Sequence, residues 1–150
     1  MTGGYGVWHM DRTRLAPLVG IVGCLLYAGL LVVPYVLVPA SSEAGVGLYY
    51  TTGAINPLVG GFFALIAVIV FAAGREGRTD PGFAAGAALV LGLFMAGIAV
   101  LWASTVPTGV VPGIGIEAPT YLSVHRWVLG VVGALVSVAG GWWASRLGLL

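Results

Sequence analysis

Four long stretches of this 150-residue chain contain no charged side chain, and they constrain the fold more than any other feature. Crossing the hydrocarbon core of a bilayer takes about 20 apolar residues in an α-helix, whereas a transmembrane β-strand takes about 9–11 and alternates polar with apolar positions. These stretches are helix-length and apolar on all sides. The sequence therefore predicts an all-α integral membrane four-helix bundle, a single transmembrane domain over residues 1–150. The predicted spans are about 15–38, 57–73, 83–104 and 127–144.

The charge content supports this prediction and excludes one class of function. Charged residues make up 7% of the chain, against about 25% in an ordinary soluble domain. The net charge is only +1 and the basic residues are dispersed. A nucleic-acid-binding surface needs a concentrated basic patch, so nucleic acid is excluded as a partner and the lipid bilayer is the expected environment.

The positions of the arginines predict the orientation. Short flanking segments rich in Arg stay in the cytoplasm. We therefore expect both termini and the loop 74–82 to be cytoplasmic in a multi-pass protein of the cell membrane, with the loops 39–56 and 106–124 facing outward. The arginines on the predicted inner side are Arg12, Arg14, Arg75, Arg78 and Arg146, and only Arg126 lies on the other side.

Several span boundaries have local signals. Asn56 before Pro57, and Asp80 before Pro81, each place a capping side chain ahead of a residue that suits the first helical turn. Gly74 is expected to be the C-cap of the second span.

Small residues recur at every fourth position in the spans, the spacing that lets helix backbones approach closely in lipid. This pattern favours packing inside one bundle, with a homo-oligomer interface as the alternative. The predicted stripes are Ala16, Gly20, Cys24 and Ala28; Gly60, Ala64 and Ala72; Ala84, Ala88, Gly92 and Ala96; and Gly133, Ser137, Gly141 and Ser145.

The chain lacks the common signatures of catalysis and cofactor binding. No span contains an ionisable Asp, Glu, Lys, Arg or His, which removes the usual sign of a proton-coupled pump. The two histidines, His9 and His125, lie outside the spans, although a haem-binding bundle needs histidines facing inward. We find no metal-ligand, nucleophile or phosphate-loop motif. The sequence therefore predicts no enzyme activity, no cofactor and no metal ion.

Polar and aromatic residues concentrate instead at the predicted outer surface, around the start of the last span. His125 and Arg126 are candidates to hold an anionic or quinone-like head group, with Glu117 or Glu43 as proton partner. An interfacial ion pair in which Trp127 anchors the helix is the simpler interpretation. The candidate outer-face residues are Glu117, Tyr121, His125, Arg126, Trp127 and Glu43.

The apolar loop 106–119, rich in Pro and Gly, is expected to lie back on the bundle or under a partner. The all-arginine basic set, the loop from Ala73 to Pro81 and the tripeptide 125–127 together resemble uncharacterised small four-span membrane proteins of halophilic archaea. The resemblance implies the four-span architecture and carries no activity or functional residue with it.

Three functions are compatible with these features. The first is a non-enzymatic accessory or scaffolding subunit that packs against a membrane protein partner, through its small-residue faces and apolar outer loop. The second is a small oligomeric transporter or channel, with a water-lined path. The third is an outer-face site for a quinone, lipid or pigment. Residues expected along the transport path are Ser137, Ser104, Thr105, Tyr27 and Pro34.

Overall fold

The computed structural model describes residues 12–37, 43–107 and 121–150. Within these ranges the chain is helical and contains no strand. The five helices are α1 (Arg12–Leu37), α2 (Glu43–Thr51), α3 (Leu58–Arg75), α4 (Pro81–Thr105) and α6 (Tyr121–Arg146). The all-α fold class predicted from the sequence is confirmed.

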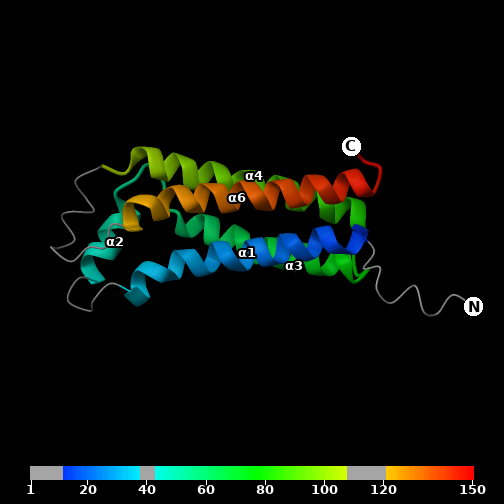
Figure 1. Cartoon of the computed structure of the whole chain (residues 1–150), viewed down its shortest axis with the longest axis horizontal. Helices are drawn as coiled ribbons and strands as arrows, with labels where there is room; N and C mark the ends of the chain where they lie inside the picture. The colour runs from blue at the N-terminus through cyan, green and yellow to red at the C-terminus, as the bar shows by residue number, and fades with distance from the viewer. Residues whose placement is uncertain (1–11, 38–42, 108–120) are drawn as a thin grey trace, which may run out of the picture.

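The four long helices form a closed ring. Helix α1 packs on α3 and α6, and α4 also packs on α3 and α6, so each long helix has two neighbours. Consecutive long helices run in opposite directions, while the short helix α2 lies across one end of the bundle (Figure 1). We call this end the α2 end.

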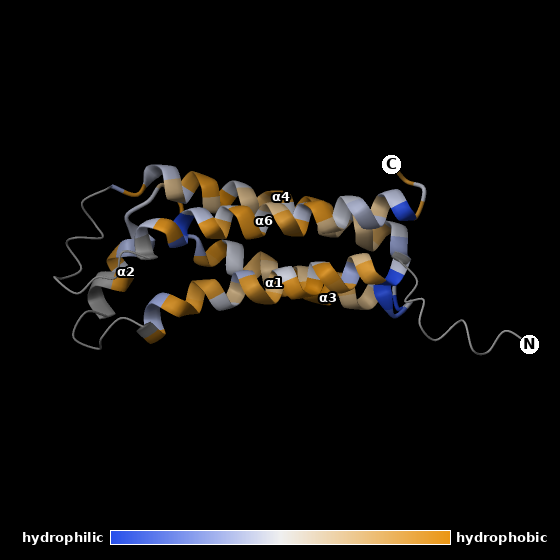
Figure 2. Cartoon of the chain, in the orientation of Figure 1, coloured by the Kyte–Doolittle hydropathy of each residue, from blue (hydrophilic) through white to orange (hydrophobic). Residues whose placement is uncertain are grey.

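The long helices are the predicted membrane spans. Within the described residues, the segments that are long and apolar enough to cross a membrane are Thr13–Val36, Leu58–Arg75, Pro81–Thr105 and Ser123–Arg146. Apolar residues run along all four, and polar residues gather where α3 turns into α4 and where α6 ends (Figure 2). We call this the arginine end, because Arg14, Arg75, Arg78 and Arg146 belong to it. The protein is therefore a multi-pass membrane protein.

The capping prediction at Asp80 is confirmed. The prediction that Asn56 is the N-cap of α3 is wrong, because Pro57 holds that position and no side chain caps it. The Asp80 carboxylate accepts a hydrogen bond from the Phe83 backbone N–H at 2.7 Å, and Pro81 is the first helical residue. The Asn56 side chain accepts from the Leu58 N–H at 2.9 Å, one residue earlier relative to the helix start than expected. Both devices satisfy an N–H group that the first turn leaves without an intrahelical partner.

The prediction that Gly74 is the C-cap of α3 is wrong. The helix continues to Arg75, Glu76 is the C-cap, and Gly77 takes the left-handed conformation, with φ of +73°. Gly74 lies inside the helix, where an added Cβ would be 2.5 Å from a ring carbon of Trp143. Close packing between helices, not chain reversal, requires glycine there.

Helices α4 and α6 approach backbone to backbone. At three glycines an added Cβ would lie within 2.9 Å of backbone atoms of the facing helix. Two of these glycines, Gly92 and Gly133, belong to the predicted stripes, but the third is Gly140 and not its neighbour Gly141, so the contact follows a step of seven residues along α6. The close pairs are Gly92 with Ser137, Gly133 with Ala96, and Gly140 with Leu89.

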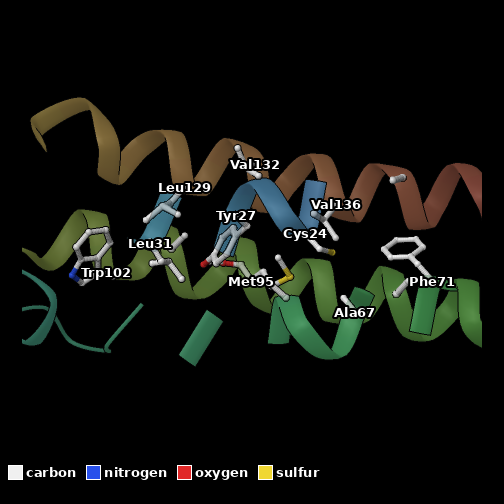
Figure 3. Close-up of a cluster of buried hydrophobic side chains, with 14 of the residues drawn as sticks. Cys24, Tyr27, Leu31, Ala67, Phe71, Met95, Trp102, Leu129, Val132 and Val136 are labelled. Carbon is white, nitrogen blue, oxygen red and sulfur yellow. Dashed lines mark hydrogen bonds between the residues drawn. The ribbon is translucent and has the colours of Figure 1, made fainter. Parts of the chain in front are cut away.

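Elsewhere a large aromatic side chain fills the space above a glycine of the neighbouring helix or turn. These side chains are fully or almost fully buried, and two of them, Phe71 and Trp143, stack with ring centroids 5.9 Å apart. Figure 3 shows Tyr27 and Phe71 among the buried aliphatic side chains of the core. The pairs are Phe71 over Gly20, Tyr27 over Gly60, Trp143 over Gly74, and Trp102 over Gly53.

One of the two predicted outer loops contains a helix, and most of the other lies outside the described residues. The segment 39–56 was predicted as an outward-facing loop between two spans, and it contains the nine-residue helix α2. Val46, Tyr49 and Tyr50 of this helix are buried, so tertiary contacts stabilise it where its composition alone gives a weak helix signal. Most of the apolar loop 106–119 lies outside the described residues.

Candidate functional site

Four aromatic rings meet at the α2 end, where α2 closes the ring of helices. Tyr49 and Tyr50 come from α2, Trp102 from the last turn of α4, and His125 from the first turns of α6. The Tyr49 ring lies 5.0 Å from Trp102 and 6.1 Å from His125, measured between centroids. All four side chains are at most 5% exposed. We call this group the aromatic–histidine cluster.

The hydrogen bonds of His125 define its tautomer. Nε2 lies 2.6 Å from the backbone oxygen of Leu30 in α1. A carbonyl oxygen only accepts, so Nε2 carries the hydrogen and donates it. In the neutral imidazole, Nδ1 then has a free lone pair and accepts from the Tyr49 hydroxyl at 3.3 Å. His125 thus connects three helices, with both ring nitrogens bonded inside the protein.

Two other polar groups of the cluster also donate hydrogen bonds to backbone carbonyls within the bundle. The Tyr50 hydroxyl donates to the Leu31 carbonyl at 2.6 Å, and the Trp102 indole N–H donates to the Tyr49 carbonyl at 3.3 Å. The Leu30 carbonyl is available because Pro34, four residues on, has no N–H to bond it. The Leu31 carbonyl accepts the Tyr50 hydroxyl through the second lone pair that every carbonyl oxygen has. The cluster therefore ties α2, α4 and α6 to the end of α1.

The structure describes only some of the side chains that were predicted for the outer-face site. Glu117 lies outside the described residues, and Glu43 and Tyr121 are the first residues of α2 and α6, with side chains that are likewise not described. His125 turns into the bundle. Trp127 is 49% exposed on the apolar surface of α6. The head-group site stays a prediction, without the outward His125 that it assumed.

Arg126 occupies the boundary between the cluster and the surface. Its Nη1 donates to the Val106 carbonyl at 3.4 Å, and its guanidinium carbon lies 5.9 Å from the ring centroid of Trp127. Its Nε atom is buried and has no acceptor among the described residues. The contact with Trp127 fits the anchoring role in the simpler interpretation.

The hydroxyl groups predicted to line a transport path are engaged with backbone carbonyls. Tyr27 donates to the Met95 carbonyl at 3.3 Å, and Ser137 donates to the Gly133 carbonyl of its own helix at 3.2 Å. Ser104 and Thr105 are exposed near the α2 end, and each donates to the carbonyl of Leu101. Among the described residues these hydroxyl groups therefore bond to helix backbone, and they give the transport alternative no support.

An apolar groove on the outer surface of α4 was not predicted from the sequence. Gly97 lies at its centre, with no atom within 4 Å of where a Cβ would be. Phe94 forms one wall and stacks on Phe63 of α3, with centroids 5.9 Å apart. The sequence does contain an indication of a second packing face on α4, because Gly86 and Gly97 lie outside the stripe of small residues predicted there. The groove is lined by Val90, Leu93, Phe94, Gly97, Ile98 and Leu101.

Comparisons with known proteins identify one family. A model described as "Family of unknown function (DUF7548)" matches residues 10–148, almost the whole chain. Comparison with curated proteins and with solved structures found no match. The family is uncharacterised, as the sequence resemblance implied, and its occurrence in halophilic archaea stays a prediction.

Proposed function

This chain belongs to the DUF7548 family, whose function is unknown, and we propose that it is a non-enzymatic accessory or scaffolding subunit that binds a transmembrane helix of another membrane protein in the α4 groove. The observation that carries the proposal is the environment of Gly97. It lies in the middle of a long helix, on the outer surface, in an open apolar groove.

Glycine inside a helix is unfavourable unless close packing uses it. It destabilises a helix by about 1 kcal/mol relative to Ala. Gly92, on the opposite side of α4, is used in this way, because its missing side chain lets the α6 backbone approach. Gly97 has no such neighbour in the described structure, and it differs from Gly29 and Gly86, which also face open space, in that it lines the groove. A helix from a partner protein is the neighbour that would make use of it.

The shape of the groove favours a helix as its occupant. From Val90 to Leu101 it extends eleven residues along α4, roughly 16 Å at 1.5 Å per residue and about half the hydrocarbon thickness. Its lining has no charged or polar side chain to select a head group. Phe94, which stacks on Phe63, forms one wall. An apolar helix with small residues at its contact face complements such a surface.

Site-specific photocrosslinking in the native host tests this proposal. Leu101, in the groove, is replaced by p-benzoylphenylalanine, and Leu25, 54% exposed on α1, is replaced in a control. Irradiation of the membranes is expected to join the first variant to one discrete protein and the second to none. Gly97→Leu, which fills the groove, is expected to prevent stoichiometric co-purification of that protein. Gly29→Leu is the matched control, because Gly29 also faces open space.

Three results would contradict the proposal. Crosslinks at Leu101 to lipid alone would make the groove ordinary lipid-facing surface, and crosslinks to other copies of this chain alone would make it a homo-oligomer interface. Equal loss of the companion protein in Gly97→Leu and Gly29→Leu would assign the loss to general damage.

We also propose that the protein lies in the cell membrane with its arginine end in the cytoplasm. The arginine distribution supports this orientation through the positive-inside tendency. A fluorescent protein fused after Leu150 is expected to fluoresce in the cytoplasm, and an alkaline phosphatase fused there to be inactive. The opposite pair of results would reverse the orientation.

A further inference from the structure

A second pocket lies at the arginine end, where all four long helices contribute residues. Its volume is about 270 Å³. A water molecule occupies about 30 Å³ of liquid, so this space exceeds what the five heavy atoms of a phosphate group require. The pocket is lined by Thr13, Arg14, Gly74, Arg75, Pro81, Trp143 and Leu147. We call it the arginine pocket.

The charges that line the arginine pocket have one sign. Arg14 and Arg75 both line it, and no acidic residue does. The Nε of Arg75 donates to the Arg14 carbonyl at 3.3 Å, which holds the guanidinium beside α1. Among the described residues neither arginine has a carboxylate partner, since the ion pair at this end joins Arg78 to Glu76. The remaining guanidinium N–H groups are therefore available to an anion.

The acidic side chains that the structure describes near the pocket are engaged with other groups. The Asp80 carboxylate accepts from the Phe83 N–H at the start of α4, and Glu76 lies 3.0 Å from the Nε of Arg78. Neither one lines the pocket. Two guanidinium groups thus present an excess of positive charge to whatever occupies this space.

The floor of the pocket is apolar and rigid. Trp143 is 2% exposed, stacks on Phe71, and occupies the space that a side chain at Gly74 would fill. Leu147 adds an aliphatic wall. A ligand that fits such a pocket has an anionic group for the arginines, joined to a less polar portion that contacts Trp143 and Leu147.

We propose that the arginine pocket binds a phosphate group, with Arg14 and Arg75 as its ligands. Guanidinium groups bind phosphate oxygens in bidentate geometry, and basic pockets between transmembrane helices bind the head groups of anionic lipids. An anionic phospholipid of the adjacent leaflet presents this chemistry at this depth, and free inorganic phosphate presents it from the aqueous side. This inference is independent of the helix-binding role of the α4 groove.

Native mass spectrometry of the purified protein tests the proposal. The protein is placed in nanodiscs of phosphatidylcholine with a minority of phosphatidylglycerol, and separately in phosphatidylcholine nanodiscs with added inorganic phosphate. The wild-type protein is expected to retain one phosphatidylglycerol or one phosphate. Arg14→Gln and Arg75→Gln are each expected to weaken retention about tenfold or more, because each removes charge-assisted hydrogen bonds.

Two further variants separate a built site from general electrostatic attraction. Arg146→Gln removes the same charge from the same end of the bundle but outside the pocket, and it is expected to retain the ligand. Leu147→Trp fills the pocket and keeps both arginines, and it is expected to lose the ligand. Protection of the buried Cys24 thiol from maleimide verifies that each variant is folded.

The outcomes are distinct. Retention of phosphatidylglycerol, with the expected pattern among the variants, identifies a lipid site, and the same pattern with phosphate alone identifies a site for a soluble anion. Retention of neither by the wild-type protein, or equal weakening by Arg146→Gln and Arg75→Gln, would overturn the proposal.

Discussion

Replacing Gly92 by Ala perturbs the closest contact between α4 and α6. The new Cβ would lie 2.5 Å from the Ser137 backbone nitrogen, about 0.9 Å short of the 3.4 Å at which ordinary van der Waals contact begins. Backbone atoms cannot rotate away, so the two helices must separate. A gap of 0.5–1 Å loses about a quarter to a half of each atomic contact's attraction. We therefore expect the substitution to destabilise the bundle.

The magnitude follows from two opposing terms. Inserting a methyl group into a well-packed interior costs about 1–3 kcal/mol, while Ala stabilises a helix by about 1 kcal/mol relative to Gly. Gly29→Ala shares the second term but not the first, because nothing lies within 4 Å of its Cβ position. The free energy of unfolding should therefore be lower for Gly92→Ala than for Gly29→Ala by about 1–3 kcal/mol.

Unfolding in mixed micelles with increasing sodium dodecyl sulfate measures this difference. Tryptophan fluorescence is a suitable signal, because Trp102 and Trp143 are buried in the folded bundle. Equal unfolding free energies for the two variants would refute the claim that close backbone contact between α4 and α6 holds the bundle together. Destabilisation by Gly29→Ala alone would refute the assignment of Gly29 to open surface.

Three further predictions concern single side chains, each checked in the same unfolding assay or by thiol labelling. His125→Ala should destabilise by about 1–3 kcal/mol, because it removes the buried hydrogen bonds to the Leu30 carbonyl and the Tyr49 hydroxyl; a neutral effect would refute the connector role. Asp80→Ala should cost about 1 kcal/mol through loss of the cap on Phe83, and Asp80→Asn should cost less. Cys24 should react with maleimide only after unfolding, and rapid labelling of the native protein would contradict its burial.

The membrane spans were predictable because charge in hydrocarbon is costly at every position along a helix. That cost acts on residues one by one, so a linear scan for uncharged stretches locates the ends of α1, α3 and α4 closely. The predicted start of the last span at 127 is wrong, because α6 begins at Tyr121 and includes His125 and Arg126, which were expected outside the spans. The Asp80 cap was predictable because it is also local in sequence: it joins groups only three residues apart. Small-residue stripes indicated the packing faces: Gly92 and Gly133 are both buried at the α4–α6 contact.

Features that depend on contacts distant in sequence were not predictable. Helix α2 exists because Tyr49 and Tyr50 bury their rings against Trp102, more than 50 residues away. His125 was expected to face a head group, and only the packing of α6 on α1 reveals that it donates to the Leu30 carbonyl. Gly140, and not the expected Gly141, faces the α4 backbone. A strict four-residue repeat drifts around a helix of 3.6 residues per turn, so it can place the contact one residue too far along the chain.

The ring arrangement of the helices has a consequence for biogenesis. Helix α6 is synthesised after the other spans, and it contacts both α1 and α4. A nascent chain that has inserted only α1, α3 and α4 leaves uncovered the face of α4 that contains Gly92. It also lacks His125, the hydrogen-bond partner of the Tyr49 hydroxyl. In such a three-span intermediate the ring is open between α1 and α4, and this face stays uncovered. Docking of α6 on α1 and α4 is thus the step that closes the ring and covers that face.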